Sequence, residues 1–172
     1  MKGTRMKKKG FAYLATGGII AAMYAAVTLL LLPISYHLMQ VRVSEALCVL
    51  PFFTPAAVPG LFIGCLVANL IGGAPLPDVI FGSLATLLAA VCTYLLGKHW
   101  KGSAAKWLAP LPAVLLNALI VGWVLCDVYQ VGEPYLICAL FVGAGQAISC
   151  YGLGMPLLYA LDKFKVRLFR EI

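Results

Sequence analysis

The chain has 172 residues, of which 63% are hydrophobic and 11% are charged, and its formal net charge is +7 at pH 7. Several apolar runs exceed the ~18 residues that a soluble core helix seldom needs. This composition excludes a soluble globular domain and predicts an all-α, polytopic membrane protein. We expect one membrane domain over residues 1–172, with a basic cytoplasmic N-terminus (1–10), a helical bundle (11–161) and a basic cytoplasmic tail (162–172).

The first predicted span is residues 11–32, which follow the basic segment MKGTRMKKKG. A secretory signal peptide is the competing interpretation, because such peptides also carry basic residues before an apolar run. This run is too long for a signal peptide and has no clear small-x-small cleavage site before Pro33. We therefore assign it as a membrane-spanning helix.

Small residues recur every four positions in this first span. One stripe is Gly17, Ala21 and Ala25, and the adjacent stripe is Gly18, Ala22 and Ala26. Small residues at this spacing let another helix approach closely. The spacing alone favours packing inside the bundle over contact with a partner protein.

The number of spans depends on residues 44–73, an apolar stretch that Pro51, Pro55 and Pro59 interrupt. Proline favours a helix break, so the stretch is either one long kinked helix or two short ones. Basic residues gather on the cytoplasmic side of a membrane, and two short helices place every Lys and Arg except Arg42 there. We therefore predict six helices with both termini inside, at residues 11–32, 43–55, 58–73, 78–97, 105–127 and 134–161.

Four of the six acidic residues fall at the outer ends of these predicted helices: Glu45, Asp78, Asp127 and Glu133. Ordinary explanations exist, since Asp78 and Glu133 suit helix N-termini and Glu45 forms an i, i+3 pair with Arg42. For Asp78 and Asp127 taken singly, the ordinary explanation is favoured. A carboxylate in the hydrocarbon region costs about 2.5–3.5 kcal/mol and usually faces a cavity instead. For Glu45 and Glu133 a ligand-binding role is therefore an equal alternative.

Uncharged polar and aromatic residues also gather in the outer half of the predicted bundle. Hydrogen bonding between helices and anchoring at the membrane interface explain each of them singly. Together with the charged residues they predict an outward-facing pocket for a small, planar, donor-rich or cationic molecule. The candidate substrate-binding residues are Arg42, Glu45, Asp78, Asn117, Trp123, Glu133 and Tyr135.

The sequence contains no G-x-x-x-x-G-K-[ST], G-x-S-x-G or H-E-x-x-H motif. The two histidines have no second ligand at metal-binding spacing. We therefore expect a protein that is not an enzyme, with no catalytic residues, cofactor, metal or nucleic-acid partner. Any uphill transport would draw its energy from a partner or from a gradient.

Four stretches carry a resemblance to a known family: RVSEALCVLPFFTPAAVPGLFIGCLVANLIGG (42–73), LPDVIFGSLATLLAA (76–90), NALIVG (117–122) and VGEPY (131–135). They resemble the QueT family, the substrate-binding S components of energy-coupling factor (ECF) transporters assigned to queuosine precursors. The resemblance implies the six-helix S-component fold in a bacterial cytoplasmic membrane, with a pocket open to the outside. It also implies an energising module of one transmembrane T protein and two ATPases, which hydrolyse the ATP.

The implied ligand is a 7-deazaguanine such as pre-queuosine. Glu133 or Glu45 would accept its guanine-like edge, and Asp78 would balance the ammonium of an aminomethyl form. Arg42 would hold Glu45 in place or close the first loop over the ligand, while Asn117 and an aromatic ring complete the site.

The resemblance also implies that an A-x-x-x-A stripe of the first helix docks on the T protein. Ala21 with Ala25, or Ala22 with Ala26, would carry this contact. Three alternatives to the implied function stay open: an S component for another vitamin or nucleobase, a gradient-driven carrier, and a small integral-membrane enzyme.

Overall fold

The computed structural model describes residues 2–35, 41–100 and 102–168, and it describes side chains over 10–35, 41–100 and 102–164. The basic side chains of residues 1–9 and 165–172, on which the predicted orientation partly depends, lie outside the described residues. All regular structure in the described ranges is helical. The elements are α1 (Lys2–Leu30), α2 (Leu32–Ser35), η1 (Val43–Phe52), α3 (Ala57–Ile71), η2 (Asp78–Gly82), α4 (Ser83–His99), α5 (Ser103–Leu108), α6 (Leu111–Trp123), η3 (Val124–Val128), α7 (Tyr135–Ala147), η4 (Ile148–Leu153) and α8 (Gly154–Leu168).

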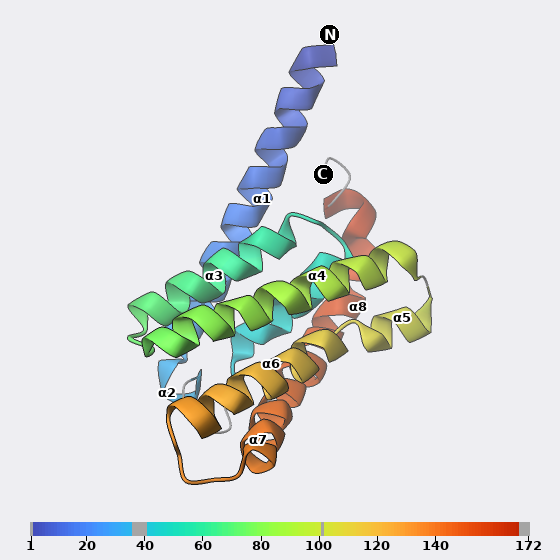
Figure 1. Ribbon diagram of the computed structural model, residues 1–172. Coiled ribbons are helices and arrows are strands. Elements are labelled where there is room, and N and C mark those ends of the chain that lie inside the picture. The colour runs from blue at the N-terminus through green and yellow to red at the C-terminus, as the bar shows by residue number, and fades with distance from the viewer. Residues whose placement is uncertain (1, 36–40, 101, 169–172) are drawn as a thin grey trace.

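Four helical stretches in the described chain are long and apolar enough to cross a membrane: Gly10–Leu30, Asp78–His99, Ser103–Val128 and Tyr135–Phe164. They confirm the prediction of an all-helical, multi-pass membrane protein. Two shorter apolar helices, η1 and α3, lie between the first and second of these stretches. In Figure 1 the N-terminal end of α1 and the C-terminal end of α8 lie at the same end of the bundle.

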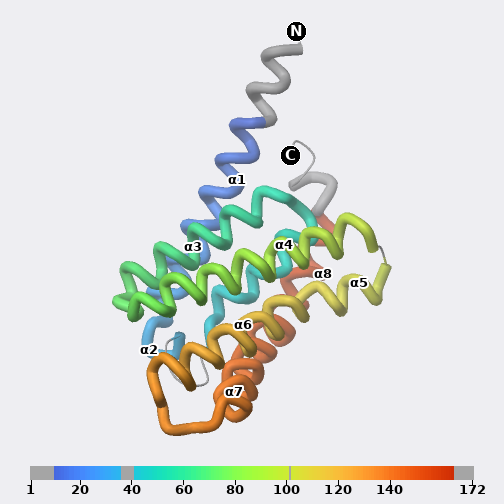
Figure 2. The backbone as a smooth tube through the Cα atoms, viewed as in Figure 1, coloured from blue at the N-terminus to red at the C-terminus, as the bar shows by residue number. Residues whose placement is uncertain are grey.

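The short segment predicted as a helix over residues 43–55 is a 3₁₀ helix, η1, of ten residues. A 3₁₀ helix rises about 2.0 Å per residue, against 1.5 Å in an α-helix, so η1 extends about 20 Å. Pro51 lies inside it, and residues Ser44–Pro51 are all buried. Figure 2 shows η1 (cyan) passing behind α4, and it packs against α1, α4, α8 and η4. The short helix η1, although Pro51 lies inside it, is therefore a central element of the core.

The later long helices also contain changes in helix type. The predicted helix at 105–127 is divided into α5 and α6 around Pro110, and its last residues form the π-helical segment η3. The predicted helix at 134–161 contains a second π-helical segment, η4, between α7 and α8. Such segments occur often at functional sites, because they change which side chains face the bundle interior.

The contact between α1 and α3 is the closest approach of two long helices near the predicted docking stripes. A Cβ atom added to Gly64 would lie 2.8 Å from the carbonyl oxygen of Ala21, and one added to Gly60 would lie 2.8 Å from that of Gly17. Ala25 is buried in the same interface. The stripe of Gly17, Ala21 and Ala25 therefore packs inside the bundle.

The neighbouring stripe of α1 faces outward. Gly18, Ala22 and Ala26 are exposed, and the large side chains beside them, Ile19 and Met23, are exposed as well. Of the two alternative docking pairs, only Ala22 with Ala26 lies on a surface that another helix reaches without displacing α3.

Candidate functional site

Arg42 and Glu45 lie at the start of η1 and are almost fully buried, with exposed fractions of 2% and 1%. The backbone N–H of Glu45 donates to the carbonyl oxygen of Arg42 at 2.9 Å, which forms the first turn of the 3₁₀ helix. Side chains at i and i+3 eclipse in this type of helix, so both residues lie on one face. The Arg42 Nε donates to the carbonyl oxygen of Ser35 at 3.1 Å and links η1 to α2.

Glu45 is held by a residue from the first long helix. Tyr24, which is fully buried on α1, donates its hydroxyl hydrogen to Glu45 Oε1. The positive charge of Arg42 also acts on the Glu45 carboxylate. A buried charge is tolerated where it is paired and hydrogen-bonded, so Tyr24, Arg42 and Glu45 form one polar network.

Hydroxyl groups extend this network between α1 and η1. Thr28 Oγ1 lies 2.8 Å from the carbonyl oxygen of Tyr24 and 2.6 Å from Ser44 Oγ. Because a hydroxyl group has one hydrogen to donate, Thr28 donates to the carbonyl and accepts from Ser44, or donates to Ser44 and leaves the carbonyl to its helix partner. Both arrangements fix the position of the Glu45 end of η1 against α1.

Asp78 is the second buried carboxylate, with an exposed fraction of 5%, and it begins η2. The side-chain amide of Asn69 on α3 donates to the Asp78 carbonyl oxygen at 3.2 Å, which fixes the start of this span. Within the described residues Asp78 Oδ1 is buried and has no hydrogen-bond partner. The charge of Arg42 acts on Asp78 as it does on Glu45.

Tyr129 follows η3 and brings a second tyrosine, after Tyr24, to this centre. Its hydroxyl oxygen is buried beside the Asp78 carboxylate. Burial and the nearby Asp78 carboxylate raise the pKa of Tyr129 to about 12. The hydroxyl therefore stays protonated near neutral pH, and it offers one hydrogen to donate and an oxygen to accept.

The structure brings together Arg42, Glu45 and Asp78 of the predicted substrate-binding set. Asn117 is buried on α6, where its side-chain amide donates to the Ala113 carbonyl oxygen at 3.0 Å. The rest of the first loop, residues 36–40, which was predicted to close over the ligand, lies outside the described residues.

The other three candidates occupy a different surface. Glu133 is exposed in the loop before α7, and Trp123 and Tyr135 are 41% and 39% exposed. Trp123 and Tyr135 line an apolar groove between α4 and α6, and the Tyr135 hydroxyl donates to the Leu119 carbonyl oxygen at 3.2 Å. The structure does not place these residues beside the buried charges.

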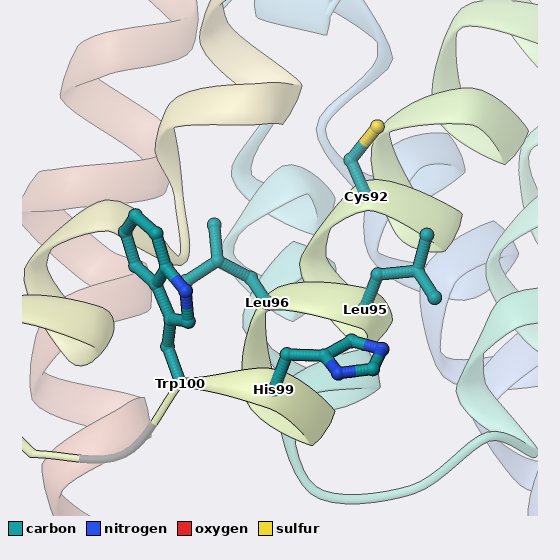
Figure 3. A pocket seen from close by; sticks show the side chains of 5 residues that line it. All are labelled: Cys92, Leu95, Leu96, His99 and Trp100. Atoms are coloured by element: carbon teal, nitrogen blue, oxygen red, sulfur yellow. The ribbon is translucent and has the colours of Figure 1, made fainter.

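A second hollow lies at the C-terminal end of α4, among the side chains in Figure 3: Cys92, Leu95, Leu96, His99 and Trp100. Its lining is almost entirely apolar, and it does not include the buried charges. All six cysteines are free thiols. The described residues contain no group of three His, Cys, Asp or Glu side chains placed to hold a metal ion.

Comparison with known proteins decides the family. A family model described as the QueT transporter matches residues 14–163. The chain belongs to the QueT transporter family. The match includes η1, Asp78 and Tyr129, so the whole buried charge centre lies within the QueT region.

A related protein has a more specific name. The queuosine precursor transporter QueT of Lactococcus lactis subsp. cremoris (strain MG1363) is 36% identical over 98 residues. The matched stretch covers 56% of this QueT-family chain and 57% of that protein. No solved structure matches the chain.

Proposed function

We propose that this QueT-family chain is the substrate-binding S component of an ECF importer and captures a queuosine precursor, a 7-deazaguanine such as pre-queuosine, from outside the cell. Membership of the family and the name of the Lactococcus lactis relative support this ligand class. The observation that carries the proposal is the centre of three buried charged residues, Arg42, Glu45 and Asp78, inside an apolar helical bundle. Buried ionisable residues in membrane-spanning regions usually mark a substrate path.

The ligand chemistry matches this centre. A 7-deazaguanine presents an amide N–H and an exocyclic amine along one edge, and carboxylates accept such pairs of donors. Glu45 supplies a carboxylate for this edge, Asp78 supplies a second buried carboxylate, and Tyr24 and Tyr129 supply aromatic faces and hydroxyl groups. Asn117 is the uncharged member of the proposed site.

The proposed topology has six spans, with η1 and α3 as the two short ones. An even number of crossings agrees with α1 and α8 ending at the same end of the bundle in Figure 1. The short spans are shielded by their neighbours, because η1 is buried along most of its length. The cytoplasmic position of both termini follows from the distribution of Lys and Arg.

The proposed partner surface is the exposed stripe of α1 that contains Gly18, Ala22 and Ala26. It would contact the T protein, whose two ATPases supply the energy. Small side chains on both helices allow close backbone contact in a membrane, where apolar burial gives little driving force. Leucine at Ala22 and Ala26 would separate the two helices.

Reconstitution into proteoliposomes tests the transport role. We expect the chain alone to bind the aminomethyl precursor without accumulating it, and the chain with the T protein and ATPases to accumulate it when ATP is present. The double variant Ala22→Leu, Ala26→Leu is expected to keep the wild-type Kd and to lose at least about nine-tenths of the uptake. Radiolabelled ligand measures both quantities.

Leu140→Ala is the control, because Leu140 is exposed on a different helix, α7. It is expected to transport normally. Sustained uptake by the chain alone, driven by an ion gradient, would show a stand-alone carrier and contradict the proposal. Normal uptake by the variant Ala22→Leu, Ala26→Leu would show that the docking surface lies elsewhere.

A further inference from the structure

The two buried carboxylates, Glu45 and Asp78, differ in their hydrogen-bond partners within the protein. Glu45 accepts a hydrogen bond from Tyr24 and lies one 3₁₀ turn from Arg42. Asp78 Oδ1 is also buried but has no hydrogen-bond partner within the described residues. An unsatisfied buried acceptor is costly, so a native structure that keeps one usually keeps it for a ligand or a water molecule.

The charges at this centre do not balance. Arg42 is the only Lys or Arg between residues 10 and 97 of the sequence, and its charge acts on both Glu45 and Asp78. Two carboxylates therefore face one guanidinium group. A ligand that brings one positive charge would leave the centre neutral, whereas a neutral ligand would leave one carboxylate uncompensated.

Ser83 and Tyr129 contribute two further buried hydroxyl groups. Ser83 follows Asp78 by five residues at the end of η2, and both residues are buried. The Ser83 hydroxyl is buried without a partner among the described residues, and the buried hydroxyl of Tyr129 lies beside the Asp78 carboxylate. One carboxylate and two hydroxyl oxygens offer three acceptors, which matches the three N–H donors of a primary ammonium. The Tyr129 ring adds a face that attracts a cation.

We propose that Asp78, Tyr129 and Ser83 form the cation-binding end of the site, where Asp78 receives an ammonium group of the ligand, and that Glu45 positions Tyr24 and Arg42. This assignment rests on the proposed function. It divides the two carboxylates between different tasks. Asp78 determines specificity for charge, and Glu45 maintains the shape of the site that receives the guanine-like edge.

Two related probes separate these roles: 7-aminomethyl-7-deazaguanine, which carries an ammonium, and 7-cyano-7-deazaguanine, which is neutral and shares the guanine-like edge. Calorimetric titration gives the ratio of their Kd values for each variant. We expect Asp78→Asn to weaken binding of the aminomethyl probe by a factor on the order of 10 to 100 and to change the cyano probe much less. Tyr129→Phe is expected to shift the ratio in the same direction by a smaller factor.

Asp127→Asn is the matched control, because Asp127 is an exposed carboxylate two residues before Tyr129. It is expected to leave the ratio unchanged. Suppose that wild-type protein binds the aminomethyl probe and that Asp78→Asn leaves the ratio of the two Kd values unchanged. This result would overturn the assignment and leave the proposed function intact. Wild-type protein that binds neither probe would instead show that the proposed ligand is wrong.

Thermal unfolding tests the division of roles without any ligand. Asp78→Asn removes an unsatisfied buried charge, so the unfolding midpoint should rise by about 2–4 °C. Glu45→Gln weakens the contact with Tyr24 and should lower the midpoint by a similar amount. A midpoint that falls in Asp78→Asn and stays constant in Glu45→Gln would reverse the roles and contradict the assignment.

Discussion

Replacement of Arg42 by methionine is expected to lower the free energy of unfolding by about 3–5 kcal/mol and to weaken binding of the aminomethyl precursor more than 100-fold. Arg42 is 2% exposed, and its charge acts on the buried carboxylates Glu45 and Asp78. Methionine keeps much of the side-chain volume, so the loss comes from the charge and from the hydrogen bond to the Ser35 carbonyl oxygen. Two carboxylates would then remain in the bundle without a compensating cation.

Thermal unfolding of the purified protein in detergent, followed by circular dichroism, measures this effect, and a midpoint lower by roughly 10 °C is expected. Lys98→Met is the control, because Lys98 is exposed at the end of α4. The unfolding midpoint of Arg42→Lys should lie between those of Arg42→Met and Lys98→Met, since lysine keeps the charge but loses the planar guanidinium. If Arg42→Met unfolds at the wild-type temperature, the charge centre does not support the fold.

Leucine at Gly64 is expected to lower the free energy of unfolding by about 2–3 kcal/mol, because the added side chain meets backbone atoms. A Cβ atom at this position would lie 2.8 Å from the Ala21 carbonyl oxygen and 2.8 Å from Tyr24 Cβ. The helices α1 and α3 would have to separate. Since Tyr24 donates to Glu45, this separation should also weaken ligand binding.

Gly18→Leu provides the comparison, because a Cβ atom at Gly18 has no atom within 4 Å. It adds the same side chain to α1 on the exposed face and should leave the unfolding midpoint and the Kd of the isolated protein unchanged. Denaturation of both variants alongside wild-type protein measures the difference in their free energies of unfolding. Equal stability of Gly64→Leu and Gly18→Leu would show that α1 and α3 do not pack as closely as described.

Hydropathy was sufficient to predict the long helices, because a run of apolar residues longer than the hydrocarbon layer has few other stable arrangements. It did not predict that residues 43–52 form a 3₁₀ helix. Helix type depends on local backbone hydrogen bonds and on Pro51, and both types bury the same apolar side chains. The π-helical segments η2, η3 and η4 were missed for the same reason.

The high cost of burying charge singled out Glu45 and Glu133; Glu45 is buried beside Arg42 and Asp78, whereas Glu133 is exposed. Trp123 and Tyr135 lie on a separate apolar groove, because a position near the outer end of a helix indicates depth in the membrane but not which face the side chain occupies. Their direct role in ligand binding stays a prediction.

Tyr24 and Tyr129 were not among the predicted site residues. A tyrosine within an apolar run has the same hydropathy pattern whether it faces lipid, the core or a ligand. The spacing of Tyr24 and Thr28, four residues apart on one helical face, is the signal that indicates a polar stripe in α1. Tyr129 has no comparable signal, because its contact with Asp78 joins residues far apart in the sequence.

The central claim, that the chain itself captures a queuosine precursor, is tested most directly by calorimetric titration of the purified wild-type protein with 7-aminomethyl-7-deazaguanine. Guanine and thiamine serve as controls for a related base and for an unrelated vitamin. Saturable binding of one ligand per chain, without binding of either control, is the predicted result. Absence of heat from folded protein, or equal binding of thiamine, would contradict the proposed ligand.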